Sequence, residues 1–131
     1  MIGLDTNVLV RYLTQDDAAQ ARKADAIISG AVARRERCVI GPIVLCELVW
    51  VLRDAYHTPK DALVATLDRI LATQQFEILD KDRVREAVEA YRDGRADFAD
   101  YVIGAANRQA GCAETVTFDR HLSGAPGFRV L

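Results

Sequence analysis

Residues 1–13 read MIGLDTNVLVRYL, and this stretch joins an apolar segment to a polar turn and then to a second apolar segment. Residues 1–4 predict a short buried strand, and Asp5-Thr6-Asn7 predicts a turn or the start of a helix. Apolar residues recur at helical spacing after Asn7. The chain is therefore predicted to begin with a β-strand that leads directly into an α-helix, with Asp5 where the strand ends.

The same alternation continues along the chain. Further short strands are predicted at residues 38–41, 76–79, 115–118 and 128–131. Helices are predicted between them at residues 18–32, 42–56, 59–74, 80–94 and 97–111. Short strands separated by helices predict a parallel sheet that is covered on both faces. We expect one α/β domain over residues 1–131, a three-layer α/β/α fold with a short central parallel sheet of four to five strands.

Composition indicates a soluble globular domain, because 50% of the residues are hydrophobic and 27% are charged. No apolar run reaches the ~20 residues that span a bilayer, and the N-terminus has no signal-peptide pattern. We therefore expect a cytoplasmic protein without a membrane segment. Three cysteines without a CxxC spacing argue against a disulfide framework or a zinc site. The net charge is −2, but 14 of the 17 basic residues are arginine, which binds phosphate bidentately.

Two acidic residues directly follow predicted strands. Asp5 follows the first strand and Asp119 follows the fourth. Ligands of open parallel sheets bind beyond the carboxyl ends of the strands, so both are candidate site residues. The alternatives are that Asp5 is only a helix N-cap and that Asp119 is only a turn residue.

Glu47 lies in the segment PIVLCELVWVL, residues 42–52, which is apolar on almost all sides of a helix. Such a pattern predicts a deeply buried helix. A buried carboxylate needs a partner or a metal ion, so Glu47 is a further candidate. The alternative is a salt bridge to an arginine elsewhere in the chain.

Asp97 and Asp100 stand three residues apart in DFADYVIGAANRQAG, residues 97–111, and so share one face of the predicted helix. Asp97 is readily explained as the N-cap of that helix. Asp100 could serve only as a favourable charge near the helix N-terminus. Because Asp100 borders the apolar face of the helix, we also consider it a candidate site residue.

Four carboxylates are therefore the predicted catalytic and metal-binding set: Asp5, Glu47, Asp100 and Asp119. They would repel one another without cations, and oxygen ligands suit Mg²⁺ or Mn²⁺. Such ions can activate water and stabilise a leaving oxygen. The two histidines, His57 and His121, are interpreted as isolated surface residues.

Arg11 is a candidate substrate-binding residue, because it lies six residues after Asp5 on the predicted helix. Its guanidinium could bind a phosphate of the substrate. The alternative is an ordinary surface ion pair.

The motifs at residues 1–13, 42–52 and 97–111, together with TVTFDRHL at residues 115–122 and the ending GAPGFRVL, resemble those of PIN-domain ribonucleases. The resemblance extends from end to end of the chain. Within that family the chain is most similar to the VapC-type toxins of bacterial toxin–antitoxin pairs. The resemblance implies an α/β/α fold, Mg²⁺ or Mn²⁺ dependence, RNA cleavage, a homodimer and a cognate antitoxin. The four candidate carboxylates match the acidic motif positions of the family. Asp97 matches a neighbouring acidic position, and Asn7 and Thr117 match polar positions that support the acids.

A partner surface is predicted from apolar helix faces. One face comprises Ala18, Ala21, Ala24, Ile27 and Ile28, and the other comprises Val49, Leu52 and Tyr56. An amphipathic antitoxin helix could lie between them. The alternative is that both faces belong to the core.

Three other functions are less well supported. A phosphate-receiver domain needs a lysine after its last strand, and Lys81 is the last lysine of the chain. A P-loop NTPase is excluded because no GxxxxGK[ST] motif is present. A non-catalytic PIN-fold module that binds RNA or protein predicts a decayed acid set, whereas all four acids are present. We therefore predict an endoribonuclease that uses water as its nucleophile.

Overall fold

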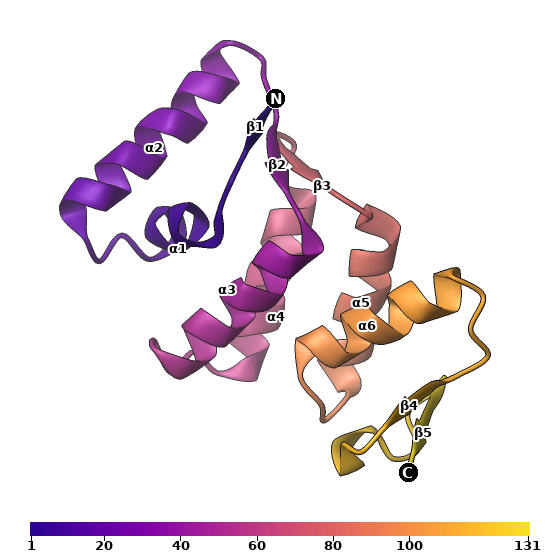
Figure 1. Ribbon diagram of the computed structural model, residues 1–131. Coiled ribbons are helices and arrows are strands. Elements are labelled where there is room, and N and C mark those ends of the chain that lie inside the picture. The colour runs from indigo at the N-terminus through magenta and orange to yellow at the C-terminus, as the bar shows by residue number, and fades with distance from the viewer. The chain divides into compact units, whose positions relative to one another are not determined.

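The computed structural model describes all residues from Met1 to Leu131. It contains six α-helices, five short strands and one 3₁₀ helix (Figure 1). The elements in chain order are β1 (Ile2–Gly3), α1 (Thr6–Thr14), α2 (Ala18–Ala33), β2 (Cys38–Ile40), α3 (Pro42–Asp54), α4 (Lys60–Ala72), β3 (Phe76–Ile78), α5 (Lys81–Asp93), α6 (Phe98–Gln109), β4 (Thr115–Thr117), η1 (Arg120–Leu122) and β5 (Phe128–Val130).

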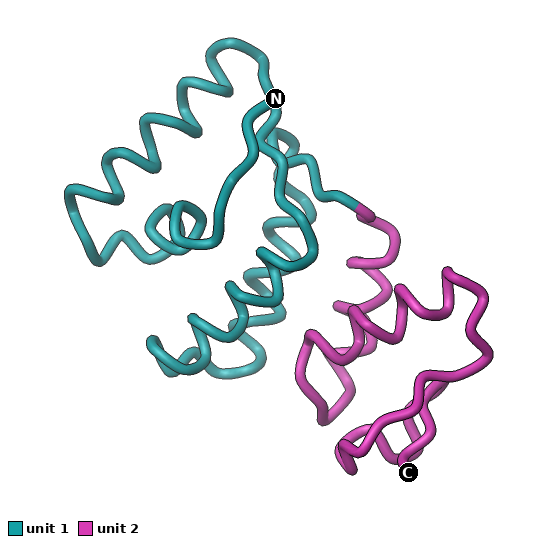
Figure 2. Tube along the Cα trace, in the orientation of Figure 1, with its two compact units in different colours: residues 1–79 teal, residues 80–131 magenta.

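The chain divides into two compact units, which Figure 2 shows in different colours. Unit 1 comprises Met1–Leu79, and unit 2 comprises Asp80–Leu131. Unit 1 therefore contains β1 to β3 with α1 to α4, and unit 2 contains the remaining elements. That the whole chain is a single domain stays a prediction.

Unit 1 is built on a parallel sheet in which β2 lies between β1 and β3. Ile2 is aligned with Cys38, and Cys38 with Phe76. Cys38 and Ile40 of the central strand are fully buried, which is why this short strand is apolar. The helices pack in sequence, α1 against α2 and α3, and α3 against α4. One or two residues separate the ends of β1 and β2 from the helices that follow, so Asp5, between β1 and α1, stands at the carboxyl edge of the sheet.

Unit 2 packs α5 against α6 and carries the parallel pair β4–β5. Phe98 is fully buried at the start of α6, and its ring lies 5.7 Å from that of Tyr91 in an edge-to-face arrangement. Gly104 brings α6 close to β5, because a Cβ atom there would lie only 2.5 Å from Cζ of Phe128. The helix pair and β5 thus share one small core.

The predicted α/β class is confirmed. Each predicted strand and helix is present, with ends within a few residues of the expected positions, and every strand pairing is parallel. The five strands are shared between the sheet of unit 1 and the pair of unit 2. Periodicity located the strands correctly, but it carries no information on which strands pair.

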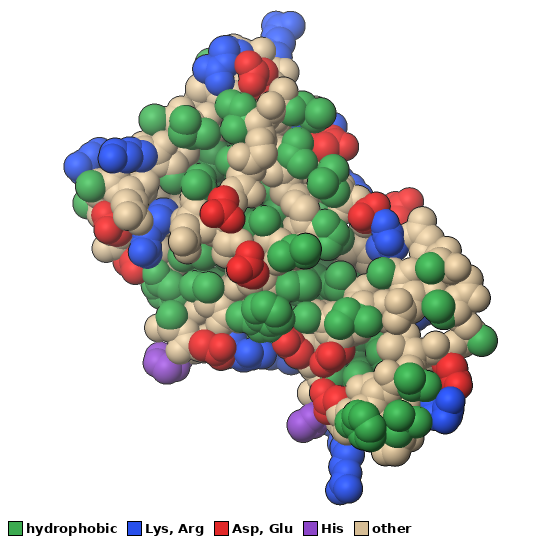
Figure 3. Space-filling model, viewed as in Figure 1, with side chains coloured by type: hydrophobic (Ala, Val, Ile, Leu, Met, Phe, Trp, Pro, Cys, Tyr) green, Lys and Arg blue, Asp and Glu red, His purple; other side chains and the backbone are tan.

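The expectation that α3 is buried on almost all sides is wrong. Leu45, Leu48 and their neighbours toward the core are buried, but Ile43 is 77% exposed and Trp50 is 40% exposed. Glu47 lies between these two on the same stripe of the helix and is also exposed. Figure 3 shows acidic side chains set in a largely apolar surface over this part of unit 1. The apolar sequence of α3 therefore reflects one core face and one apolar surface stripe.

Most of the predicted antitoxin surface is buried, although Ala18 and Ile27 of α2 are exposed. Ala21, Ala24 and Ile28 are at most 4% exposed, Val49 is 1% exposed and Leu52 is 6% exposed. These side chains form the core of unit 1, which was the alternative interpretation. No helix of the chain combines the length and the apolar character needed to cross a membrane.

Candidate functional site

Asp5 stands at the junction of β1 and α1. Its backbone is extended, with φ −83° and ψ 162°, and its Oδ1 accepts a hydrogen bond of 2.8 Å from the backbone N–H of Thr6. Asp5 is therefore the N-cap of α1, as the alternative reading proposed. Its side chain remains exposed at the carboxyl end of β1, so capping and a functional role are compatible.

Glu47 is tied to α1 by a threonine. The hydroxyl of Thr6 donates a hydrogen bond of 2.8 Å to Oε1 of Glu47, and Thr6 is only 6% exposed. The partner of Glu47 is therefore a buried hydroxyl and not an arginine. Because Thr6 also donates its N–H to Asp5, one residue connects both candidate carboxylates of unit 1. Sequence reasoning missed Thr6, although its position beside Asp5 in the first helical turn was a usable signal.

Arg11 takes part in a polar network. Its guanidinium lies 3.1 Å from Oδ1 of Asp16, donates to the hydroxyl of Tyr56 at 3.1 Å and donates to Gln20 at 2.6 Å. The ion pair that was the alternative interpretation is thus present. Arg11 and Asn7 also line a hollow of about 280 Å³ in unit 1. Contact of Arg11 with substrate stays a prediction.

Asp97 and Asp100 act together at the start of α6. Asp97 is the N-cap, and the two residues form a capping box in which the N–H of Asp97 donates to Oδ2 of Asp100 at 3.2 Å. The interpretation of Asp97 as the N-cap is confirmed. The box fixes the position of the Asp100 carboxylate relative to the helix.

Asp100 is half-buried, and desolvation raises its pKa above that of an ordinary carboxyl group. The hydrogen bond from Asp97 opposes this shift, whereas the nearby charges of Asp119 and Asp97 add to it. The nearby His121 favours the charged form of the Asp100 carboxyl group. A carboxylate that is desolvated and faces other carboxylates is stabilised by a bound cation.

Asp119 follows β4 and caps η1. Its Oδ1 accepts from the backbone N–H of His121 at 2.9 Å, and its own N–H donates to the hydroxyl of Thr117 at 3.0 Å. The hydrogen bonds from His121 hold the pKa of Asp119 below its usual value. Thr117 therefore supports Asp119 directly, in the position that the resemblance implied.

His121 is not isolated, and the earlier interpretation of this residue is wrong. Its Nδ1 lies 2.9 Å from Oδ1 of Asp119. The tight turn of η1 brings a side chain two residues after the aspartate back onto its carboxylate. His121 is exposed, as expected, and so is His57. The motif DRHL, residues 119–122, could have indicated this contact, because the histidine follows a candidate acid by two residues.

Each unit thus brings together two of the four predicted carboxylates: Asp5 with Glu47 in unit 1, and Asp100 with Asp119 in unit 2. No group of three or more Asp, Glu, His or Cys side chains is arranged so that it could hold a metal ion. The chemistry of the donors fits Mg²⁺ or Mn²⁺, because both pairs offer carboxylate oxygens and no thiolate. The predicted four-carboxylate metal site stays a prediction.

Comparison with known proteins agrees with these features. A family model for the PIN domain matches residues 2–127, which includes both units. The chain is also similar to a VapC ribonuclease of Aquifex aeolicus (strain VF5), with 24% identity over 117 residues. That alignment covers 89% of this chain and 86% of the relative. The resemblance to PIN-domain proteins of the VapC type is therefore confirmed.

Proposed function

Because this chain belongs to the PIN domain family, we propose that it is a Mg²⁺- or Mn²⁺-dependent endoribonuclease that hydrolyses RNA phosphodiesters. The observation that carries the proposal is the pairing of acids within each unit. Thr6 links Glu47 to the helix that Asp5 caps, and Asp100 lies close enough to Asp119 for their charges to interact. Similarity to a VapC ribonuclease supports RNA as the substrate.

In this proposal Asp5 and Asp100 are the principal metal ligands, and Glu47 and Asp119 complete the set or orient water. When bound, a divalent ion activates water and stabilises developing negative charge. Thr6 holds Glu47, and Thr117 holds Asp119 through its backbone N–H. Asp97 positions Asp100 by the capping box. These hydrogen bonds orient the carboxylates before substrate binds, which lowers the cost of reaching the transition state.

The proposed biological role is that of the toxin of a type II toxin–antitoxin pair acting in the cytoplasm. It implies a cognate antitoxin and a homodimer as partners. The similarity to the VapC ribonuclease supports this role. Mapping RNA ends in cells after induction tests it, and Asp5→Ala serves as the inactive control. We expect new RNA ends only with the wild-type chain, and their suppression when the neighbouring antitoxin gene is co-expressed. Equal patterns of ends with wild type and Asp5→Ala would contradict the proposed role.

Replacing Thr6 by Val tests how Glu47 is positioned. The substitution conserves volume but removes the hydroxyl that donates to Glu47. We expect RNA cleavage to fall about tenfold, and the free energy of unfolding to fall by about 1 kcal/mol, the usual net value of one hydrogen bond. The rate of cleavage and the thermal unfolding midpoint are the measurements.

Thr66→Val is a matched control, because Thr66 is a buried threonine of unit 1 whose hydroxyl donates to Ala62 O within its own helix. It should lower stability by a similar amount without changing cleavage. Equal loss of cleavage in the two variants would refute a specific role for Thr6.

A further inference from the structure

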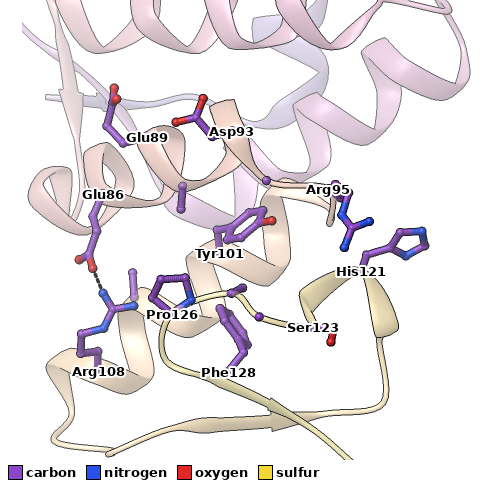
Figure 4. A pocket seen from close by; sticks show the side chains of 15 residues that line it. Glu86, Glu89, Asp93, Arg95, Tyr101, Arg108, His121, Ser123, Pro126 and Phe128 are labelled. Carbon is purple, nitrogen blue, oxygen red and sulfur yellow. Dashed lines mark hydrogen bonds and ion pairs between the residues drawn. The ribbon is translucent and has the colours of Figure 1, made fainter.

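Unit 2 contains a pocket of about 420 Å³ between α5, α6 and the segment that links η1 to β5 (Figure 4). Its apolar lining consists of Ala90, Tyr101, Ala105, Ala125, Pro126 and Phe128. Figure 4 shows Arg95 beside His121 at one end of the pocket, and Arg108 paired with Glu86 at the other. We propose that this pocket binds one nucleotide of the RNA next to the cleaved bond, an inference that rests on the proposed nuclease function.

A buried tyrosine and two glycines give the pocket its shape. The ring of Tyr101 is almost fully buried, and its hydroxyl accepts a hydrogen bond of 3.2 Å from the N–H of Ala96. Any side chain at Gly94 would collide with that hydroxyl and would come within 2.8 Å of the carbonyl oxygen of Ala90. Gly124 has a φ of +79°, which permits the turn that closes the pocket. The cavity is therefore formed before any ligand arrives, as binding pockets usually are.

The middle of the pocket suits a nucleobase. The rings of Tyr101 and Phe128 meet edge to face, with their centroids 6.3 Å apart, and Phe128 is only half-buried. Bases bind to aromatic side chains by stacking, with little dependence on sequence. Pro126 and Ala90 extend the apolar surface beside these rings. A flat ring is thus the chemical class of ligand that this surface fits.

The charged groups around the pocket favour a phosphate at the end near His121. Arg95 is exposed and makes no ion pair, so its guanidinium is available for a bidentate contact with phosphate. The acidic residues of α5 are engaged or turned outward. Glu86 pairs with Arg108 and Glu89 lies 3.0 Å from Arg92, and Figure 4 shows the Asp93 carboxylate pointing away from Phe128.

The position of the pocket connects it to the candidate active site. His121 lines the pocket, and its Nδ1 lies 2.9 Å from Oδ1 of Asp119. A phosphate held by Arg95 at this end would therefore lie next to the acids of unit 2. A base in the pocket and its phosphate at Arg95 would fix the register of the RNA relative to Asp119.

Binding of adenosine 5′-monophosphate to the full chain tests the proposal directly. The measurement is an NMR titration in EDTA, with ribose 5-phosphate and inorganic phosphate as probes of the phosphate contact alone. We expect adenosine 5′-monophosphate to bind at least fivefold more tightly than either, and to shift the amide signals of residues that line the pocket. Ala90→Phe fills the pocket from an exposed position of α5 and should abolish this binding.

Arg95→Gln should weaken binding of adenosine 5′-monophosphate about fivefold and raise the KM for RNA by a similar factor. Arg85→Gln is the matched control. Arg85 also lies on the surface of unit 2 but does not line the pocket, so both values should stay unchanged. Equal affinity for the nucleotide and for inorganic phosphate, or binding that survives Ala90→Phe, would overturn the proposal.

Failure of the nuclease function gives a different result. If the wild-type chain binds the nucleotide in the pocket but cleaves no RNA, the subsite stands and the proposed function fails. If RNA is cleaved with an unchanged KM in both Ala90→Phe and Arg95→Gln, the function stands and the subsite is refuted.

Discussion

Asp100→Asn is expected to reduce RNA cleavage by about 10²- to 10³-fold while the protein remains folded, a loss typical of removing one key electrostatic group from an active site. Asparagine keeps an oxygen that can accept the hydrogen bond from Asp97, so the capping box can persist. It lacks the negative charge that makes a carboxylate a strong ligand of a divalent ion. The single-turnover rate of RNA cleavage is the measurement.

The same variant should be at least as stable as the wild type in the absence of metal. A carboxyl group whose pKa is raised by folding binds protons more readily in the folded state, so its ionisation destabilises the fold as pH rises through that range. At neutral pH the wild type carries this penalty and Asp100→Asn does not. As pH rises from the ordinary carboxyl pKa of 3.8 to neutral pH, thermal unfolding should therefore show a smaller loss of stability attributable to position 100 in the variant.

Asp82→Asn is the control for both measurements, because Asp82 is a fully exposed acid of α5 that has only a long ion pair with Arg85. It should leave cleavage and its pH dependence unchanged. Cleavage by Asp100→Asn at the wild-type rate would contradict the assignment of Asp100 as a metal ligand. A loss of cleavage that is explained by unfolding would contradict the predicted stability.

Removal of divalent metal is expected to abolish cleavage entirely. Without cations, Asp100 and Asp119 repel each other within unit 2. Mn²⁺ should therefore raise the unfolding midpoint, and a ligand at 100 times its Kd stabilises a protein by about 2.7 kcal/mol. Asp5→Asn should reduce this increase, because it removes one proposed ligand. An unfolding midpoint that stays constant up to millimolar Mn²⁺ would refute metal binding by these carboxylates.

Much of the fold could be predicted from local patterns. The predicted strands at residues 38–40 and 76–78 are present, with Cys38, Ile40, Phe76 and Ile78 buried, and Asp97 caps the helix that it was expected to cap. These features depend on residues close together in the sequence, and propensity and capping report on such interactions. Strand pairing depends on residues far apart, which is why the division of the strands between two sheets was not predicted.

The candidate site was predicted less completely than the fold. The positions of Asp5 and Asp119 after strands followed from the element order. The surroundings of Glu47 did not, because an apolar helix sequence does not distinguish a core face from an apolar surface stripe. Thr6 and His121 were missed because their contacts depend on side-chain direction in a first helical turn and in a 3₁₀ turn.

Because His121 contacts Asp119, two cleavage reactions have to be distinguished. A histidine can act as a general base on the 2′-hydroxyl of RNA, which leaves a 2′,3′-cyclic phosphate and needs no metal. End-group analysis of RNA cut by the purified protein, with Mg²⁺ and with EDTA, distinguishes the two reactions. We predict 5′-phosphate and 3′-hydroxyl ends with Mg²⁺ and no cleavage in EDTA. Cyclic-phosphate ends, or undiminished cleavage in EDTA, would contradict metal-dependent hydrolysis by the carboxylates.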